Sequence, residues 1–199
     1  MIIDAIVLAG GRATRLDGAS KPALVLGGQS LLSSTLAAVG RARRIVVVGD
    51  ETALDAGFGG FTVVREEPAF AGPAAGIAAG LAALNDSDFT IVVACDMPAV
   101  ASAIEVLLAA LRAGSDGVVA VSADGREQPL VGVYSTGALR DSTRLHRDAG
   151  NLENLSVRAF LSGLSPTPVA VPDGSTDDVD TWADAARLGV VAPVHESKE

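Results

Sequence analysis

The sequence predicts an α/β fold, a three-layer α/β/α sandwich built around a mostly parallel sheet. Short, nearly continuous apolar runs, typical of strands buried on both faces, alternate with Ala- and Leu-rich stretches that have helical spacing. The predicted strands span residues 2–9, 44–49, 61–64, 88–95 and 117–121. The predicted helices between them span residues 31–39, 74–84 and 101–111.

The pattern changes after residue 121. Residues 128–135 alternate less regularly and follow a turn-like segment, so we expect an antiparallel addition to the sheet. Further helices are predicted at 137–145 and 155–161, then a strand at 167–171, then a helix that starts near Thr181 with Asp180 or Thr181 as its N-cap. We expect one domain over residues 1–191 and a flexible polar tail over 192–199.

Composition narrows the class of protein. The chain of 199 residues is 49% hydrophobic and 20% charged, which excludes a disordered chain. Its net charge of −9 argues against a general nucleic-acid-binding surface. With one cysteine, no leader pattern and no apolar run long enough to cross a membrane, we expect a cytoplasmic protein without membrane or nucleic-acid partners.

A glycine-rich, basic segment from Leu8 to Lys21 follows the first predicted strand. In open α/β sheets, ligands bind beyond the carboxyl ends of the strands. Glycines let backbone N–H groups approach a phosphate, and Arg15 and Lys21 add positive charge, so the segment suits a triphosphate. Its spacing matches neither a Walker A loop nor a dinucleotide-binding loop. A plain tight turn remains the alternative, which the basic residues disfavour.

Asp96 ends the apolar run 88–95 and is predicted to face the same crevice. Mg²⁺ is commonly held by one or two carboxylates together with substrate phosphates, so Asp96 is the candidate metal ligand. The alternative is an N-cap for the helix that follows. Asp50, after the strand 44–49, is a weaker candidate for contact with a base or ribose. Cys95 is expected to pack as a small apolar side chain.

The pattern L-A-G-G-x-x-x-R-L-x-G-x-x-K-P-x-L resembles the signature of the molybdenum cofactor guanylyltransferase family, the MobA-like nucleotidyltransferases. Weaker matches continue in the family's order from about Ile3 to Leu188. The resemblance implies a Rossmann-like sheet of the nucleotide-diphospho-sugar transferase type. It also implies Mg²⁺-dependent transfer of GMP from GTP to molybdopterin, with release of pyrophosphate.

The resemblance also implies roles for residues around the nucleotide. Arg15 would hold the phosphates, Lys21 would neutralise charge as pyrophosphate leaves, and Asp96 would bind Mg²⁺. Contacts to the nucleotide are implied for Leu8, Ala9, Gly10, Gly11, Lys21, Asp96 and an acidic residue, Glu66 or Glu67. We place Glu66 in that role, although either glutamate could be an ordinary solvated charge.

On the acceptor side, the resemblance implies that Arg126 and Gln128 line the pterin pocket, and that Arg158 meets an anionic pterin phosphate. Asp180 would lie near the metal or the acceptor, and Trp182 stands where the family usually has proline. For Arg158, a surface charge on an amphipathic helix is the alternative. A protein that delivers the cofactor is a possible partner.

Three other functions compete. The same fold could transfer CMP to molybdopterin or to another phosphorylated acceptor, although L-A-G-G rather than L-A-A-G favours guanine. A sugar-phosphate nucleotidyltransferase usually needs more chain for its sugar-binding part. A nucleotide-binding adaptor without catalysis is consistent with fold similarity alone, but the presence of Arg15, Lys21 and Asp96 argues against it.

Overall fold

A computed structural model describes residues 1–11, 14–16, 18–50 and 60–193. Its main sheet has seven strands in the order β5-β4-β1-β6-β8-β7-β9. The strands in that order are Thr62–Val64, Ile45–Val48, Ile3–Leu8, Phe89–Ala94, Glu127–Ser135, Gly117–Val121 and Thr167–Ala170. Only β8 runs antiparallel to its neighbours, β6 and β7, as predicted, and the other paired strands are parallel.

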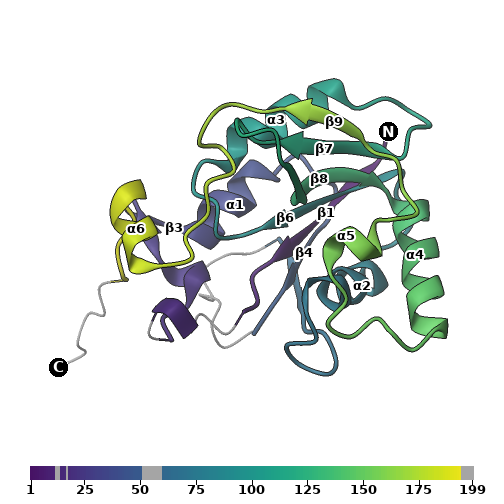
Figure 1. Cartoon of the computed structure of the whole chain (residues 1–199), viewed down its shortest axis with the longest axis horizontal. Coiled ribbons are helices and arrows are strands. Elements are labelled where there is room, and N and C mark those ends of the chain that lie inside the picture. Colours follow the sequence, from purple (N-terminus) through teal and green to yellow (C-terminus); the bar gives the residue numbers. More distant parts are fainter. Residues whose placement is uncertain (12–13, 17, 51–59, 194–199) are drawn as a thin grey trace.

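Helices cover both faces of the sheet, which confirms the three-layer α/β/α sandwich (Figure 1). Helices α1 (Leu31–Ala38) and α3 (Val100–Ala110) pack on one face. Helices α2 (Pro73–Ala83), α4 (Thr136–Asp148) and α5 (Val157–Phe160) pack on the other. Strand β1 shows why both faces need cover, because Ala5 and Val7 enter one core while Ile6 enters the other.

A third, smaller apolar cluster lies at one end of the sheet. It joins Leu16 of the 3-10 helix η1 (Thr14–Leu16) and Leu24, which follows the 3-10 helix η2 (Lys21–Ala23), to helix α6 (Trp182–Leu188). Leu16 and Leu24 are fully buried in it, together with Val179. Figure 1 shows α6 beside the purple segments that follow β1. The glycine-rich segment and the segment before α6 therefore form one structural unit.

Several local details differ from the prediction. A small hairpin of β2 (Val25–Leu26) and β3 (Gln29–Ser30) was not expected, because two-residue strands carry no periodicity. The N-cap of α6 is Thr181, whose hydroxyl accepts a hydrogen bond from the Asp184 N–H in a capping box. The alternative that Asp96 caps a helix is wrong, since Ala99 holds the N-cap position of α3.

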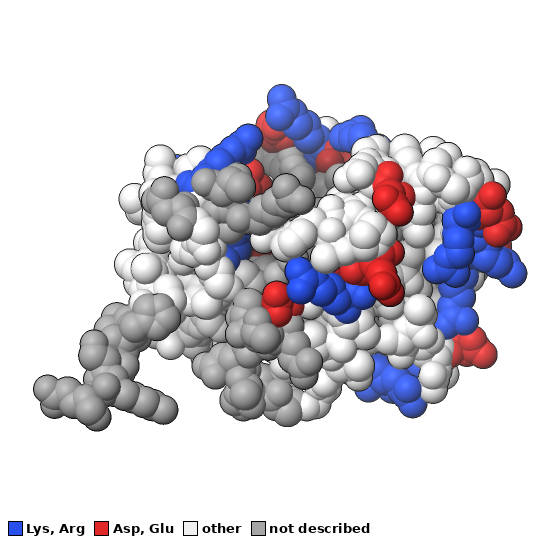
Figure 2. Space-filling view, turned by 90° about the horizontal axis from the view of Figure 1, so that it is seen from below, with Lys and Arg blue, Asp and Glu red and all other residues white. Residues whose placement is uncertain are grey.

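Two predictions about the surface can be compared with the structure. No helix in the described ranges is both long and apolar enough to cross a membrane. On the face drawn in Figure 2, basic and acidic side chains lie beside one another and do not form one extended basic area. The part of the predicted tail from 194 to 199 lies outside the described residues.

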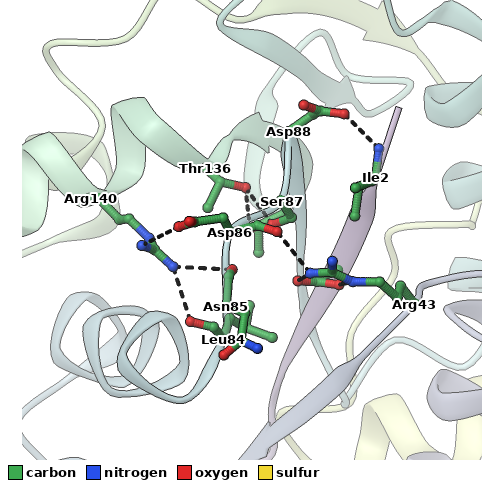
Figure 3. A network of polar contacts seen from close by, with 11 residues as sticks. Ile2, Arg43, Leu84, Asn85, Asp86, Ser87, Asp88, Thr136 and Arg140 are labelled. Atoms are coloured by element: carbon green, nitrogen blue, oxygen red, sulfur yellow. Dashed lines mark hydrogen bonds and ion pairs between the residues drawn. The ribbon is translucent and has the colours of Figure 1, made fainter.

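A polar network ties the amino-terminal edge of the sheet together (Figure 3). Asp4, fully buried on β1, accepts two hydrogen bonds from Arg43, 3.0 Å from Nε and 2.8 Å from the terminal nitrogen. Arg43 also donates to the carbonyl of Asp86, whose carboxylate pairs with Arg140 at 3.2 Å. The network keeps a buried charge paired, and it lies at the sheet edge opposite to the glycine-rich segment.

Arg43→Met should lower the midpoint of thermal unfolding by several degrees, because it leaves the buried Asp4 carboxylate without its partner. Arg41→Met, at an exposed position in the same turn, is the control and should have little effect. Asp4→Asn added to Arg43→Met should restore part of the loss. Equal midpoints for the Arg41 and Arg43 variants would contradict this role of the pair.

Gly117→Ala should destabilise the protein by about 2 kcal/mol or more, as measured by urea unfolding. Gly117 has φ 120°, and a Cβ there would lie 2.0 Å from the Val133 carbonyl oxygen. Gly125→Ala is the control, since Gly125 also has a positive φ of 82° but no atom would lie within 4 Å of its Cβ. If both variants lost the same stability, the contact with Val133 would not matter.

Candidate active site

The site begins where β1, β4 and β6 end at one edge of the sheet. Beyond these strands the pairing continues, with the Ala9 N–H donating to the Val48 carbonyl at 2.8 Å and the Cys95 N–H to the Leu8 carbonyl at 3.0 Å. The chain then leaves β1 through Gly10 and Gly11. Gly11 has φ 146°, and a Cβ there would meet no atom within 4 Å, so this backbone is exposed at the mouth of the site.

Two cavities, of about 310 and 190 Å³, open at this edge. Both are lined by Gly10, Gly11, Lys21, Glu66 and Phe70. Leu8 and Asp96 also line the larger cavity, while Ala9 and Asp50 also line the smaller one. A wider hollow of about 760 Å³ lies over α1 and α3, but its described lining holds no predicted site residue. The structure thus gathers the predicted nucleotide-binding residues around one place.

Lys21 forms the central contact of the site. Its Nζ atom donates to Asp96 Oδ2 at 3.1 Å and to Asp180 Oδ1 at 2.5 Å. Burial lowers the pKa of Lys21, but the hydrogen bond that it donates to Asp180 and the charge of Asp96 outweigh this effect, so the pKa is raised and the ammonium stays charged. Arg15 reaches the other oxygen of Asp180 at 3.7 Å, with a largely exposed side chain.

Three carboxylates converge beside Lys21. Asp96, Asp178 and Asp180 each offer an oxygen, and these atoms all lie within 4.8 Å of one another. The Val179 N–H donates to the Asp96 carbonyl at 3.0 Å, and this hydrogen bond attaches the segment with Asp178 and Asp180 to the end of β6. Burial raises the pKa of Asp178, and the nearby charges of Asp180 and Asp96 raise it further. Hard oxygen ligands of this kind fit a divalent cation such as Mg²⁺ or Mn²⁺.

Sequence analysis missed Asp178. The available signal was the alternation D-D-V-D, in which the buried Val179 separates two aspartates that can share one face of an extended segment. No sequence signal near these residues indicates that this face meets the end of β6.

The two candidate glutamates occupy different places. Glu66 lines both cavities, and its Oε1 atom accepts a hydrogen bond from the Phe70 N–H at 2.9 Å. Glu67 lines a separate hollow beside α2. Asp50 is ion-paired with Arg65 at 3.1 Å in the wall of the smaller cavity. Of the two glutamates, the geometry therefore favours Glu66 for contact with a nucleotide.

Of the predicted acceptor residues, only Asp180 is brought into contact with Lys21. Arg126 is exposed on the turn between β7 and β8 and pairs with Asp124 at 3.3 Å, while Gln128 donates to the Ser122 hydroxyl at 3.1 Å. Arg158 is exposed on α5. None of these three is among the described residues that line the two cavities, whereas Leu130 of β8 is, and it was not predicted.

Cys95 is buried beside Asp96, as expected of a packing residue. Burial, followed by the charge of Asp96, raises the pKa of its thiol far above the usual range. The thiol therefore stays protonated and is not a nucleophile.

Sequence comparison identifies the chain's relatives. The family model described as the MobA-like NTP transferase domain matches residues 5–166. A molybdenum cofactor guanylyltransferase of Shewanella baltica strain OS155 is 33% identical over 152 residues, which are 74% of this chain and 76% of that protein. The match over most of the chain confirms the resemblance inferred from the glycine-rich segment.

Solved structures share the fold. Molybdopterin-guanine dinucleotide biosynthesis protein A of Archaeoglobus fulgidus superposes with a TM-score of 0.69 at 23% identity, over 93% of this chain and 96% of that chain. The 2-C-methyl-D-erythritol 4-phosphate cytidylyltransferase of Thermus thermophilus gives 0.68 at 21% identity, over 95% of this chain and 100% of that chain. With its glycine-rich segment, its acidic cluster and these sequence matches, the chain belongs to the MobA-like NTP transferase family and is a nucleotidyltransferase.

Proposed function

We propose that the protein transfers GMP from GTP to molybdopterin with Mg²⁺, forming molybdopterin guanine dinucleotide and pyrophosphate. The observation that carries the proposal is the position of Lys21, which lies between the glycine backbone at residues 10 and 11 and the carboxylates of Asp96 and Asp180. The curated relatives that are about one-third identical are named molybdenum cofactor guanylyltransferases, which supports guanine and molybdopterin as substrates.

The reaction places modest demands on the protein. A phosphate oxygen of the acceptor bonds to the α-phosphorus of GTP, the bond to the β-phosphate bridge oxygen breaks, and the electron pair leaves with pyrophosphate. The acceptor oxygen is already anionic, so no general base is required. Catalysis then consists of positioning and charge stabilisation. Lys21 and the N–H groups near Gly10 and Gly11 supply positive potential, and the exposed Arg15 can reach the outer phosphates.

The carboxylates of Asp96, Asp178 and Asp180 would hold the magnesium ion. Three acidic groups so close together are unfavourable unless cations accompany them, and Lys21 and the exposed Arg15 supply only two positive charges against three carboxylates. When bound, Mg²⁺ would neutralise phosphate charge and orient the triphosphate. Lys21 and the metal would share Asp96 and Asp180. The Lys21 ammonium would therefore lie beside the metal ion, a position from which it can turn towards the pyrophosphate.

Lys21→Met and Asp96→Asn should each reduce GTP-dependent pyrophosphate release in the presence of molybdopterin by about 100-fold or more, since each removes a charge from the reacting centre. Pyrophosphate release with each of the four nucleoside triphosphates measures this. Arg112→Met and Asp141→Asn, which remove exposed charges elsewhere, should keep the wild-type rate. Selective turnover of CTP by the wild type would overturn the guanylyl assignment.

Asp178→Asn should raise the Mg²⁺ concentration needed for half-maximal activity roughly tenfold or more, because it removes one carboxylate of the cluster. Direct titration with Mn²⁺, followed by its paramagnetic resonance signal, should show the same weakening without turnover. Asp177→Asn is the matched control and should keep the wild-type metal affinity, since Asp177 pairs with Arg187 at 2.6 Å and is not part of the cluster. Unchanged metal affinity in Asp178→Asn would remove this residue from the metal site.

A further inference from the structure

We propose that Phe70 is a stacking platform for the base of the bound nucleotide, and that Arg65 and Glu66 hold it in position. The inference deepens the proposed function and rests on it, in that a nucleoside triphosphate must occupy the cavity. The sequence pattern assigned no role to Phe70.

Phe70 is an unusual residue for this position on the surface. It is 45% exposed although it is a large apolar side chain, and it lines both cavities of the site. Aromatic residues make up only 4% of the chain. The other apolar walls of the larger cavity include Leu8, Val48 and Leu130. A partly exposed aromatic ring that lines such a cavity is a suitable surface for stacking a planar base.

The backbone of Phe70 is held in a rarely used conformation. Its φ is +64°, in the left-handed region that bulky side chains seldom adopt. The Phe70 N–H donates to Glu66 Oε1 at 2.9 Å, and on the other side the Asn154 N–H donates to the carbonyl of Ala71 at 2.7 Å. Strained residues of this kind persist where their surroundings fix them, and they concentrate at ligand sites. The strain therefore points to a function for the ring.

Arg65 sets the position of the ring itself. The centre of its guanidinium lies 5.1 Å from the centroid of the Phe70 ring, within the range of a cation–π contact. Arg65 is in turn anchored by Asp50, just after the end of β4. The ring is thus connected to the sheet edge through two side chains, which limits how much its tilt can vary.

Stacking contributes affinity for the base but little choice between bases, because every base has a π-face. The carboxylate of Glu66 has two oxygens, of which Oε1 holds the Phe70 backbone. Glu66 is therefore a positioning residue in addition to its proposed nucleotide contact. Replacing its charge and replacing its hydrogen-bond acceptor should have separable effects.

Phe70→Leu tests the platform, because leucine has a similar apolar volume and no ring. We expect its dissociation constant for GTP with Mg²⁺, measured by calorimetry, to rise about tenfold, while Phe70→Trp stays within about threefold of the wild type. The dissociation constant of inorganic tripolyphosphate, which has no base, should be the same in all three proteins. In Phe70→Trp, GTP should quench more tryptophan fluorescence than in the wild type, whereas tripolyphosphate should not.

Phe70→Gly separates stacking from the backbone. Glycine accepts the positive φ, so Phe70→Gly should not have a lower melting temperature than Phe70→Leu, yet its affinity for GTP should be as weak.

Glu66→Gln keeps an acceptor oxygen for the backbone N–H of residue 70, whereas Glu66→Ala does not. When each is combined with Phe70→Trp, Glu66→Gln should therefore retain more of the GTP-induced fluorescence quenching than Glu66→Ala. Arg65→Ala should weaken GTP binding, and Arg144→Ala, an exposed and ion-paired arginine on α4, is its control.

Two outcomes would overturn the inference while leaving the proposed function intact. One is unchanged affinity for GTP in Phe70→Leu, and the other is an equal loss for GTP and tripolyphosphate, which would mean that the loop and not the ring was affected. A wild-type protein that bound no nucleoside triphosphate would overturn both proposals. If it bound CTP in preference to GTP, the guanylyl assignment would fail, and the same series measured with CTP would decide the role of Phe70.

Discussion

The contact of the Lys21 ammonium with Asp96 and Asp180 is the interaction on which the rest of the site depends. It joins the segment after β1, the end of β6 and the segment before α6. The small apolar cluster that contains Leu16 and Val179 joins the first and the last of these segments. Apolar packing brings the acidic residues together despite their repulsion, and Lys21 compensates part of that repulsion. A cluster assembled in this way brings three carboxylate oxygens close together, an arrangement that fits a divalent cation.

Much of the fold could be predicted because the sheet is buried on both faces, so its strands appear as continuous apolar runs. The antiparallel strand β8 was also foreseen from its weaker pattern. The hairpin of β2 and β3 and the two 3-10 helices were not, because two or three residues carry no period that could reveal them. Asp180 and Thr181 both suit an N-cap, and only the Asp184 side chain, which completes the capping box with Thr181, decides between them.

The site was predictable where it follows strands directly. The glycines at 10 and 11 and Asp96 come just after β1 and β6, which are paired neighbours, so their meeting follows from the sheet order. Asp178 was not predictable, because its approach to Asp96 depends on the packing of a distant segment. The acceptor assignments remain predictions for Arg126, Gln128 and Arg158, which lie on a turn, on β8 and on a short helix, and which do not line the two cavities beside Lys21. Glu66 carries a structural hydrogen bond that no local pattern could show.

The docking of α6 beside the glycine-rich segment also bears on biosynthesis. During translation, Asp178 and Asp180 are made after the glycine-rich segment, Asp96 and the other residues that line the two cavities. Until that segment is made and Val179 packs with Leu16 and Leu24, the acidic cluster has only one of its three carboxylates, that of Asp96. Under the proposed function, a chain that stopped before Asp178 would contain the residues that line the two cavities but only one of the three carboxylates for the ion.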